Sequence, residues 1–175
     1  MRKILLYLLA VLTLNQFCLF ASPKHEMPPA YVGSPEFERL KGLTGVWKGS
    51  SEMDDEKHEA TVEYYVTSNG SAVVEKLFPG TPHEMISVYH DKKGKLAMTH
   101  YCGFGNQPQL DLVSSNEKEM KFDFSNSNDI DPAKEDHMHS LTLTFDGKDK
   151  LVQNWGCMKG GADAGKTVIV LARAS

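Results

Sequence analysis

Most of the chain after residue 45 consists of short runs in which apolar and polar residues alternate, and turn-forming residues bound each run. A period of two is typical of strands with one buried face. The pattern predicts ten strands: 46–52, 60–68, 71–78, 84–90, 95–102, 109–114, 118–124, 138–145, 149–156 and 166–173. Short links join nearly all of them, which favours an all-β fold, a single antiparallel up-and-down β-barrel of about ten strands.

A short helical pattern over residues 36–42 precedes the first strand, which begins Gly45-Val46-Trp47. This opening resembles the calycins (the lipocalin superfamily), whose barrels begin with a short helix and a first strand marked Gly-x-Trp. The resemblance implies a closed barrel with a lumen. It also implies that a basic residue on the last strand packs across the Trp, and Arg173 matches that role as a cation–π partner.

Three further stretches are distinctive: 78–85, 99–108 and 137–140. Together they resemble a group of uncharacterised exported bacterial proteins with a calycin-like barrel. This resemblance implies a fold and a pocket, and it brings no catalytic role with it.

The amino terminus has the pattern of a targeting segment, because Arg2 and Lys3 precede an apolar stretch that ends at the small residues Ala21 and Ser22. The predicted organisation is a cleaved signal peptide over 1–21, a linker over 22–35 and one calycin-like barrel domain over 36–175. We therefore expect an exported protein, periplasmic or secreted, without stable membrane insertion after the leader is removed.

The charge and the cysteines narrow the expected partners and redox state. The net charge is −4, which gives no basic field to collect nucleic acid. Without the leader, the cysteines are Cys102 and Cys157. Export permits one disulfide between them, and two buried thiols are the alternative.

The clearest hairpin spans 62–77 and turns at Asn69-Gly70, a dipeptide suited to a type I′ turn. Tyr64 and Glu75 then share the more apolar face, which we predict to face the lumen. A carboxylate among apolar neighbours must be paired, neutral or bound to something. Either Glu75 pairs inside the barrel with Tyr64 or a histidine and fixes the register, or it anchors a ligand.

The same parity argument turns other residues inward. Alternation places Met98, His100 and Cys102 on one face of their strand. The preceding strand depends on the loop near 91–94. A loop with an even number of residues turns His83, Met85, Ser87 and Tyr89 inward, and an odd-length loop turns Ile86, Val88 and His90 inward. Further along, the inward set comprises Phe122, Phe124, His139, Leu141, Leu143, Gln153, Trp155 and Cys157.

These faces support a leading hypothesis, a binding protein that holds a small, largely apolar molecule in the lumen. The predicted ligand-binding residues are Trp47, Tyr64, Glu75, Met98, His100, Phe122, Phe124, His139 and Trp155. The alternative is a metal- or haem-binding barrel, enzymatic or not, built on His100, His139 and His83 or Glu75. A third hypothesis is a structural barrel with a filled core. No catalytic residue and no obligatory cofactor is assigned.

Overall fold

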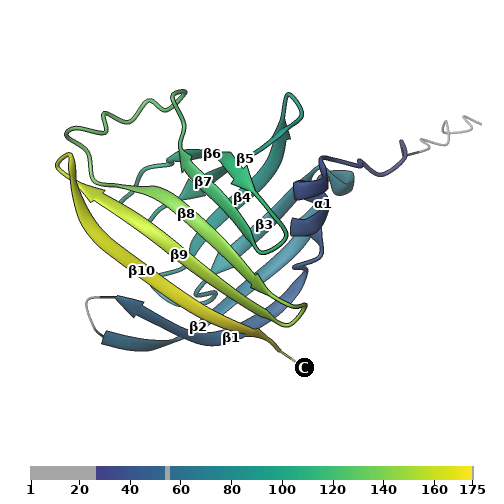
Figure 1. Cartoon of the computed structure of the whole chain (residues 1–175), viewed down its shortest axis with the longest axis horizontal. Coiled ribbons are helices and arrows are strands. Elements are labelled where there is room, and N and C mark those ends of the chain that lie inside the picture. The colour runs from purple at the N-terminus through teal and green to yellow at the C-terminus, as the bar shows by residue number, and fades with distance from the viewer. Residues whose placement is uncertain (1–26, 54–55, 175) are drawn as a thin grey trace, which may run out of the picture.

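In the computed structural model, which describes residues 27–53 and 56–174, ten strands form one closed antiparallel barrel (Figure 1). Each strand pairs with its neighbours along the chain, and the last pairs with the first. The elements are α1 (Pro35–Lys41), β1 (Gly45–Met53), β2 (Glu56–Thr67), the 3₁₀ turn η1 (Ser68–Gly70), β3 (Ala72–Leu77), β4 (Met85–Lys92), β5 (Lys95–Tyr101), β6 (Gln109–Ser115), β7 (Glu119–Phe124), β8 (His137–Asp146), β9 (Lys150–Lys159) and β10 (Ala162–Arg173). The predicted barrel and its short leading helix are confirmed.

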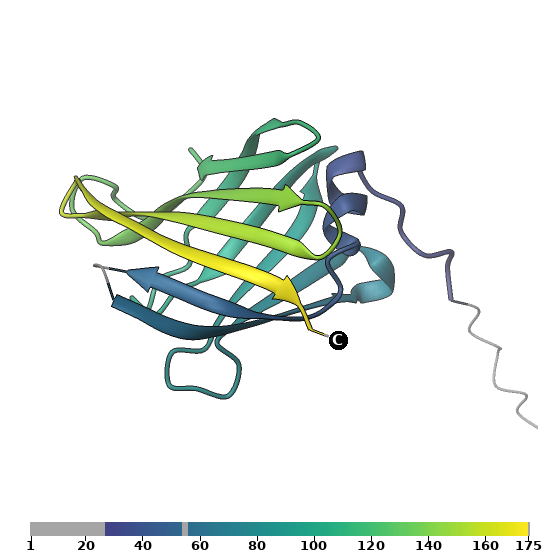
Figure 2. The same ribbon diagram turned by 60° about the horizontal axis from the view of Figure 1, so that its bottom comes forward.

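Two regions differ from the sequence prediction or lie beyond the structure. The hairpins β1–β2 and β9–β10 are longer than predicted and extend away from α1 (Figure 2). The predicted signal peptide over 1–21 lies outside the described residues. Across the described part of the chain, no helix combines the length and apolar character needed to cross a bilayer.

The pairing registers settle the two predicted hairpins. Tyr64 pairs with Glu75 across β2 and β3, so the inward face of this hairpin is as expected. Its turn is the 3₁₀ turn η1 rather than a two-residue type I′ turn, and Asn69 keeps a positive φ of 52°. The next hairpin pairs Lys92 with Lys95, an even-length turn that places Ser87 opposite His100.

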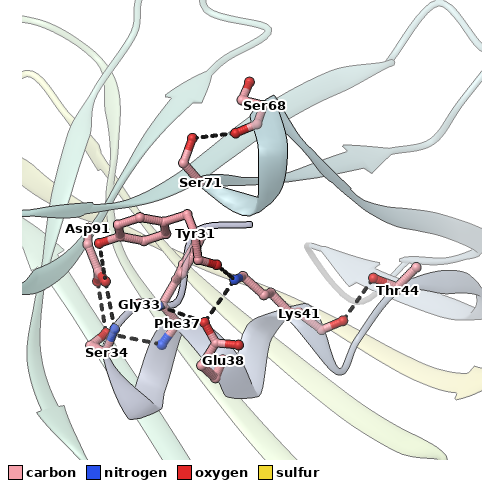
Figure 3. Close-up of polar contacts among 10 residues, drawn as sticks. All are labelled: Tyr31, Gly33, Ser34, Phe37, Glu38, Lys41, Thr44, Ser68, Ser71 and Asp91. Atoms are coloured by element: carbon pink, nitrogen blue, oxygen red, sulfur yellow. Dashed lines mark hydrogen bonds and ion pairs between the residues drawn. The ribbon is translucent and has the colours of Figure 1, made fainter. Parts of the chain in front are cut away.

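The N-cap residue Ser34 connects the start of helix α1 to the barrel. Ser34 Oγ accepts a hydrogen bond from the Phe37 amide (3.2 Å). The Ser34 hydroxyl and amide donate to the two carboxylate oxygens of Asp91 on β4, at 2.8 and 2.7 Å (Figure 3). The capped helix buries Phe37 and Leu40 completely, so these two side chains close that end of the lumen.

Trp47 and Arg173 complete the closed end. The Trp47 indole donates to the Leu43 carbonyl (2.8 Å), and the Arg173 guanidinium lies 4.4 Å from the indole centroid. Arg173 also donates to the carbonyls of Gly42 and Thr44, at 2.9 and 2.8 Å. The predicted cation–π pair is therefore confirmed, and it joins β1 and β10 to the chain between α1 and β1.

The half of the barrel nearest α1 is filled with side chains. Its buried core comprises Phe37, Leu40, Leu43, Trp47, Val73, Tyr89, Leu96, Met98, Met120, Phe122, Leu143, Leu151 and Leu171. Tyr89 and Phe122 make an edge-to-face contact there, with ring centroids 5.8 Å apart. Because side chains fill the lumen near α1, a binding site inside the barrel can lie only toward the opposite end.

Candidate functional site

A cavity of about 560 Å³ occupies the barrel end opposite α1. Its apolar lining comprises Leu77, Phe78, Met85, Phe104, Met138, Trp155 and Ile169. Its polar lining comprises Ser51, His58, Glu59, Thr81, His83, His100, Cys102 and Thr167, with Gly103 between Cys102 and Phe104. Although the polar residues are as numerous as the apolar ones, most of the surface that the cavity wall exposes is apolar. A hollow of this size with a mainly apolar surface is typical of a small-molecule site.

Behind the cavity lies a row of directly paired residues on four adjacent strands: Tyr64 on β2, Glu75 on β3, Ser87 on β4 and His100 on β5. All four are almost completely buried. Strict alternation turns each of them inward, so their polar groups meet inside the barrel. Only His100 borders the cavity, where the row ends.

Glu75 is the centre of this network. Its Oε1 accepts from the Tyr64 hydroxyl (2.5 Å) and the Gln153 amide (2.6 Å), and its Oε2 accepts from the Tyr89 hydroxyl (3.0 Å). All three donors are neutral. Burial raises the pKa of Glu75, while the donated hydrogen bonds oppose that rise. Of the two predictions for Glu75, pairing with Tyr64 inside the barrel is confirmed.

Two aromatic rings connect this network to the cavity wall. The Trp155 indole donates to Gln153 Oε1 (2.9 Å), and its ring centroid lies 4.7 Å from that of His100. His100 Nδ1 lies 3.0 Å from Ser87 Oγ. Burial lowers the pKa of His100 to about 4, so its imidazole is neutral at neutral pH.

The nine predicted ligand residues separate into four groups. His100 and Trp155 line the cavity, and Tyr64 and Glu75 lie in the network behind them. Three others belong to the buried core of the packed half: Trp47, Met98 and Phe122. The remaining two, Phe124 and His139, stack on each other with centroids 5.2 Å apart.

His139 does not line the cavity because β8 contains an irregularity. The register between β8 and β9 shifts between Met138 and Ser140, and such a bulge reverses the facing of the residues before it. Met138 therefore borders the cavity in place of His139. His139 instead lies 3.0 Å from the ring nitrogen of His137 and 3.6 Å from the Asp123 carboxylate.

The predicted metal set is not brought together. His83 and His100 line the cavity, and His139 does not. Across residues 27–53 and 56–174, no three His, Cys, Asp or Glu side chains gather as a metal site. Of the two alternatives for Cys102 and Cys157, a disulfide or two thiols, the structure has two free thiols. Burial raises the pKa of both thiols.

A second hollow, about 610 Å³, lies outside the barrel beside α1. Its two arginines are already engaged, since Arg39 donates to the carbonyls of Asn116 and Glu117 and Arg173 donates to main-chain carbonyls. The internal cavity, with unengaged apolar walls and a buried histidine, is the stronger candidate site.

Two parts of the site have no role in the sequence-based prediction. Gln153 lies on the predicted inward face without an assigned role, although an amide beside an inward Trp and an inward Glu is a signal for one. Phe78 and Phe104 lie in the loops 78–84 and 102–108, where no alternation exists to predict their direction.

No family model matches the chain, and no curated protein matches it. The functional argument therefore rests on the cavity and the network behind it.

Proposed function

We propose that this protein is an exported, calycin-like binding protein that holds a small, largely apolar molecule in the open half of its barrel. The observation that carries the proposal is the cavity of about 560 Å³ with seven apolar side chains in its lining. Barrels of this size hold one small ligand when their interior is not filled by side chains. Burial of an apolar molecule there is favoured by roughly 25 cal/mol for each Å² removed from water.

The rigid surroundings of the cavity support binding rather than a filled structural barrel. Glu75, Tyr64 and Gln153 hold one another by hydrogen bonds of 2.5 to 2.7 Å. A fully satisfied buried network fixes the side chains that belong to it. Trp155 and His100 are therefore held in place before a ligand arrives, which reduces the entropy lost on binding.

The test is binding of N-phenyl-1-naphthylamine, a neutral apolar fluorophore, to the purified protein, together with native mass spectrometry of protein isolated from its own compartment. We expect saturable binding near one molecule per chain and a retained organic mass. The absence of both saturable probe binding and a retained organic mass would overturn the proposal.

A matched pair of variants locates the bound molecule. Thr167→Trp adds an indole to the cavity lining and should abolish probe binding. Val170→Trp adds the same indole to the same strand on an exposed position, so binding should persist. Equal loss in both variants would place the probe elsewhere.

The metal or haem hypothesis is tested on the same preparation by metal analysis and an absorption spectrum. His100 and His83 share the cavity with the sulfur atoms of Met85, Met138 and Cys102, which are soft ligands. A stoichiometric metal or haem band that is lost in His100→Ala would replace the apolar ligand as the function of this cavity.

A further inference from the structure

The residue that follows β3, Phe78, has a backbone conformation that is rare for a bulky side chain. Its φ is 54°, in the left-handed region that glycine adopts freely and that other residues avoid. Such a conformation is unfavourable by itself and persists only where the surrounding structure holds it. The residues around Phe78 must therefore supply the contacts that keep it there.

A set of hydrogen bonds fixes the backbone on both sides of Phe78. Its amide donates to the Thr61 carbonyl at 2.9 Å. Its carbonyl accepts from the amide and the hydroxyl of Thr81, at 3.2 and 2.8 Å. The turn that follows is held in the same way, because the Gly80 amide donates to the Glu84 carboxylate at 2.7 Å. The turn, and not the preference of Phe78 itself, therefore determines this conformation.

The left-handed conformation changes the direction of the Phe78 side chain. The preceding residue, Leu77, is almost completely buried and faces the lumen. In a continuous strand the next side chain would face outward. Leu77 and Phe78 nevertheless both line the cavity, although they are consecutive. The strained backbone therefore places two successive apolar side chains in the wall of one cavity.

We infer that Phe78 is a specificity-determining residue, whose ring contacts the bound molecule at the mouth of the cavity and limits the size of molecule that fits. The inference rests on the proposed function and adds the residue that selects among apolar molecules. Phe78 packs against the buried core and is itself only partly buried, so its ring lies where the cavity meets solvent. A residue that only had to turn the chain would be glycine, as at Gly80, whose φ is 74°. Strain of this kind is typical of functional sites.

Two neutral apolar fluorophores test the size limit: N-phenyl-1-naphthylamine and the larger Nile red. Fluorescence titration measures their affinities for the wild type and for Phe78→Ala. The variant should bind N-phenyl-1-naphthylamine about fivefold or more weakly, because an aromatic contact is lost. It should bind Nile red at least as tightly as the wild type does, because the ring no longer occupies the mouth.

Two results would overturn the inference and leave the proposed function intact. One is an unchanged affinity of Phe78→Ala for N-phenyl-1-naphthylamine, and the other is an equal loss of affinity for both probes. Failure of the wild type to bind either probe would also overturn the inference. If no organic mass were retained either, the proposed function would fail with it.

Phe145 provides the matched control, because it is also a partly buried phenylalanine that packs against the core. It lies beside α1, where the Arg39 guanidinium is 3.7 Å from its ring centroid, and it is not part of the cavity lining. Phe145→Ala should lower the midpoint of thermal unfolding and leave both probe affinities within about twofold, since the two sites are far apart. If it changes the affinities as Phe78→Ala does, general destabilisation explains both variants and the inference is overturned.

A ligand-free measurement tests the strained backbone. At an ordinary position, substitution by Gly destabilises a protein more than substitution by Ala, because Gly loses more entropy on folding. At Phe78 the order should be reversed, since Phe78→Ala keeps the left-handed strain and Phe78→Gly relieves it. Lys93, with a φ of 55° in the exposed turn between β4 and β5, is the control and should show the same reversed order. A higher midpoint of thermal unfolding for Phe78→Ala than for Phe78→Gly would overturn the inference.

Discussion

The two halves of this barrel are built from the same ten strands with the same inward alternation, and yet one half is packed and the other is hollow. Near α1, Phe37 and Leu40 enter the lumen end and Trp47 fills the space beside them. At the other end the loops 78–84 and 102–108 contribute Phe78 and Phe104 to the rim of a cavity. The difference teaches that alternation builds the barrel wall, while the segments that cover each end decide whether the lumen is filled.

The largest expected contrast between the halves comes from two methionines. Met120 is fully buried in the packed half, and Met85 borders the cavity. Met120→Ala should lower the free energy of unfolding by about 2–5 kcal/mol, because it removes buried contacts and leaves a new void. Met85→Ala enlarges an existing hollow and should lower it by about 1 kcal/mol or less. Urea denaturation measures both, and equal losses would contradict the division into two halves.

A second contrast comes from pH, because His100 lies at the boundary between the halves. Its pKa is about 4 in the folded protein and 6.5 in an unfolded chain. Between these values the unfolded chain binds a proton that the folded protein does not, so stability falls as the pH falls from 6.5 toward 4. The expected loss is about 3 kcal/mol.

The control for this pH effect is His100→Phe, in which the difference from wild type isolates one titrating group. The variant should lose less stability on acidification than the wild type over the same interval. Parallel curves of unfolding free energy against pH for the two proteins would show that His100 titrates normally in the folded state.

A third contrast concerns the closed end alone. Arg173→Met removes the contact with Trp47, the hydrogen bonds to three main-chain carbonyls and an exposed ion pair with Asp149, so the free energy of unfolding should fall by about 2 kcal/mol. Probe affinity should be unchanged, since the cavity lies at the other end of the strands. Chemical denaturation and probe titration of the same sample measure both quantities. Weakened binding at unchanged unfolding free energy would mean that the two ends are coupled.

The barrel could be predicted because its signal is local and repeated. Tyr64 opposite Glu75 followed from alternation and the position of one turn, and the register has that pairing. The exact turn did not follow, because a 3₁₀ turn and a type I′ turn both suit Asn69-Gly70 and give the same facing. Parity arguments tolerate such errors as long as the loop length changes by an even number.

The site could be predicted only in part, because one extra residue reverses parity. The bulge between Met138 and Ser140 has no clear sequence signal. Because of it, Met138 lines the cavity and the predicted His139 does not. The alternating pattern also does not show which part of the lumen is filled by side chains. Met98 and Phe122 in the packed half therefore have the same sequence signal as Trp155 in the cavity lining. Which inward residues meet a ligand depends on what covers each barrel end, and that is set by distant segments.

The smallest predicted effect concerns Ser34, the N-cap of the helix α1 that covers the closed end of the barrel. Ser34→Ala removes the acceptor for the Phe37 amide and one of the hydrogen bonds to Asp91. An N-cap serine contributes typically about 1 kcal/mol, so the free energy of unfolding should fall by that amount. Thermal unfolding measures the loss. Probe binding should stay at the wild-type value, because α1 lies at the opposite end from the cavity.

Ser71→Ala is the matched control, because Ser71 also uses its hydroxyl near this end, donating to the Ser68 carbonyl at 2.8 Å in a surface turn. Ser71 follows the three-residue 3₁₀ turn η1 and its hydroxyl caps no α-helix, so the loss should stay within about 0.5 kcal/mol. A Ser34→Ala variant as stable as Ser71→Ala would mean that burial of Phe37 and Leu40 holds α1 without its cap. The apolar face of α1 would then be sufficient to keep the packed half filled. The hydrogen bonds between Ser34 and Asp91 would only orient the chain that precedes the helix.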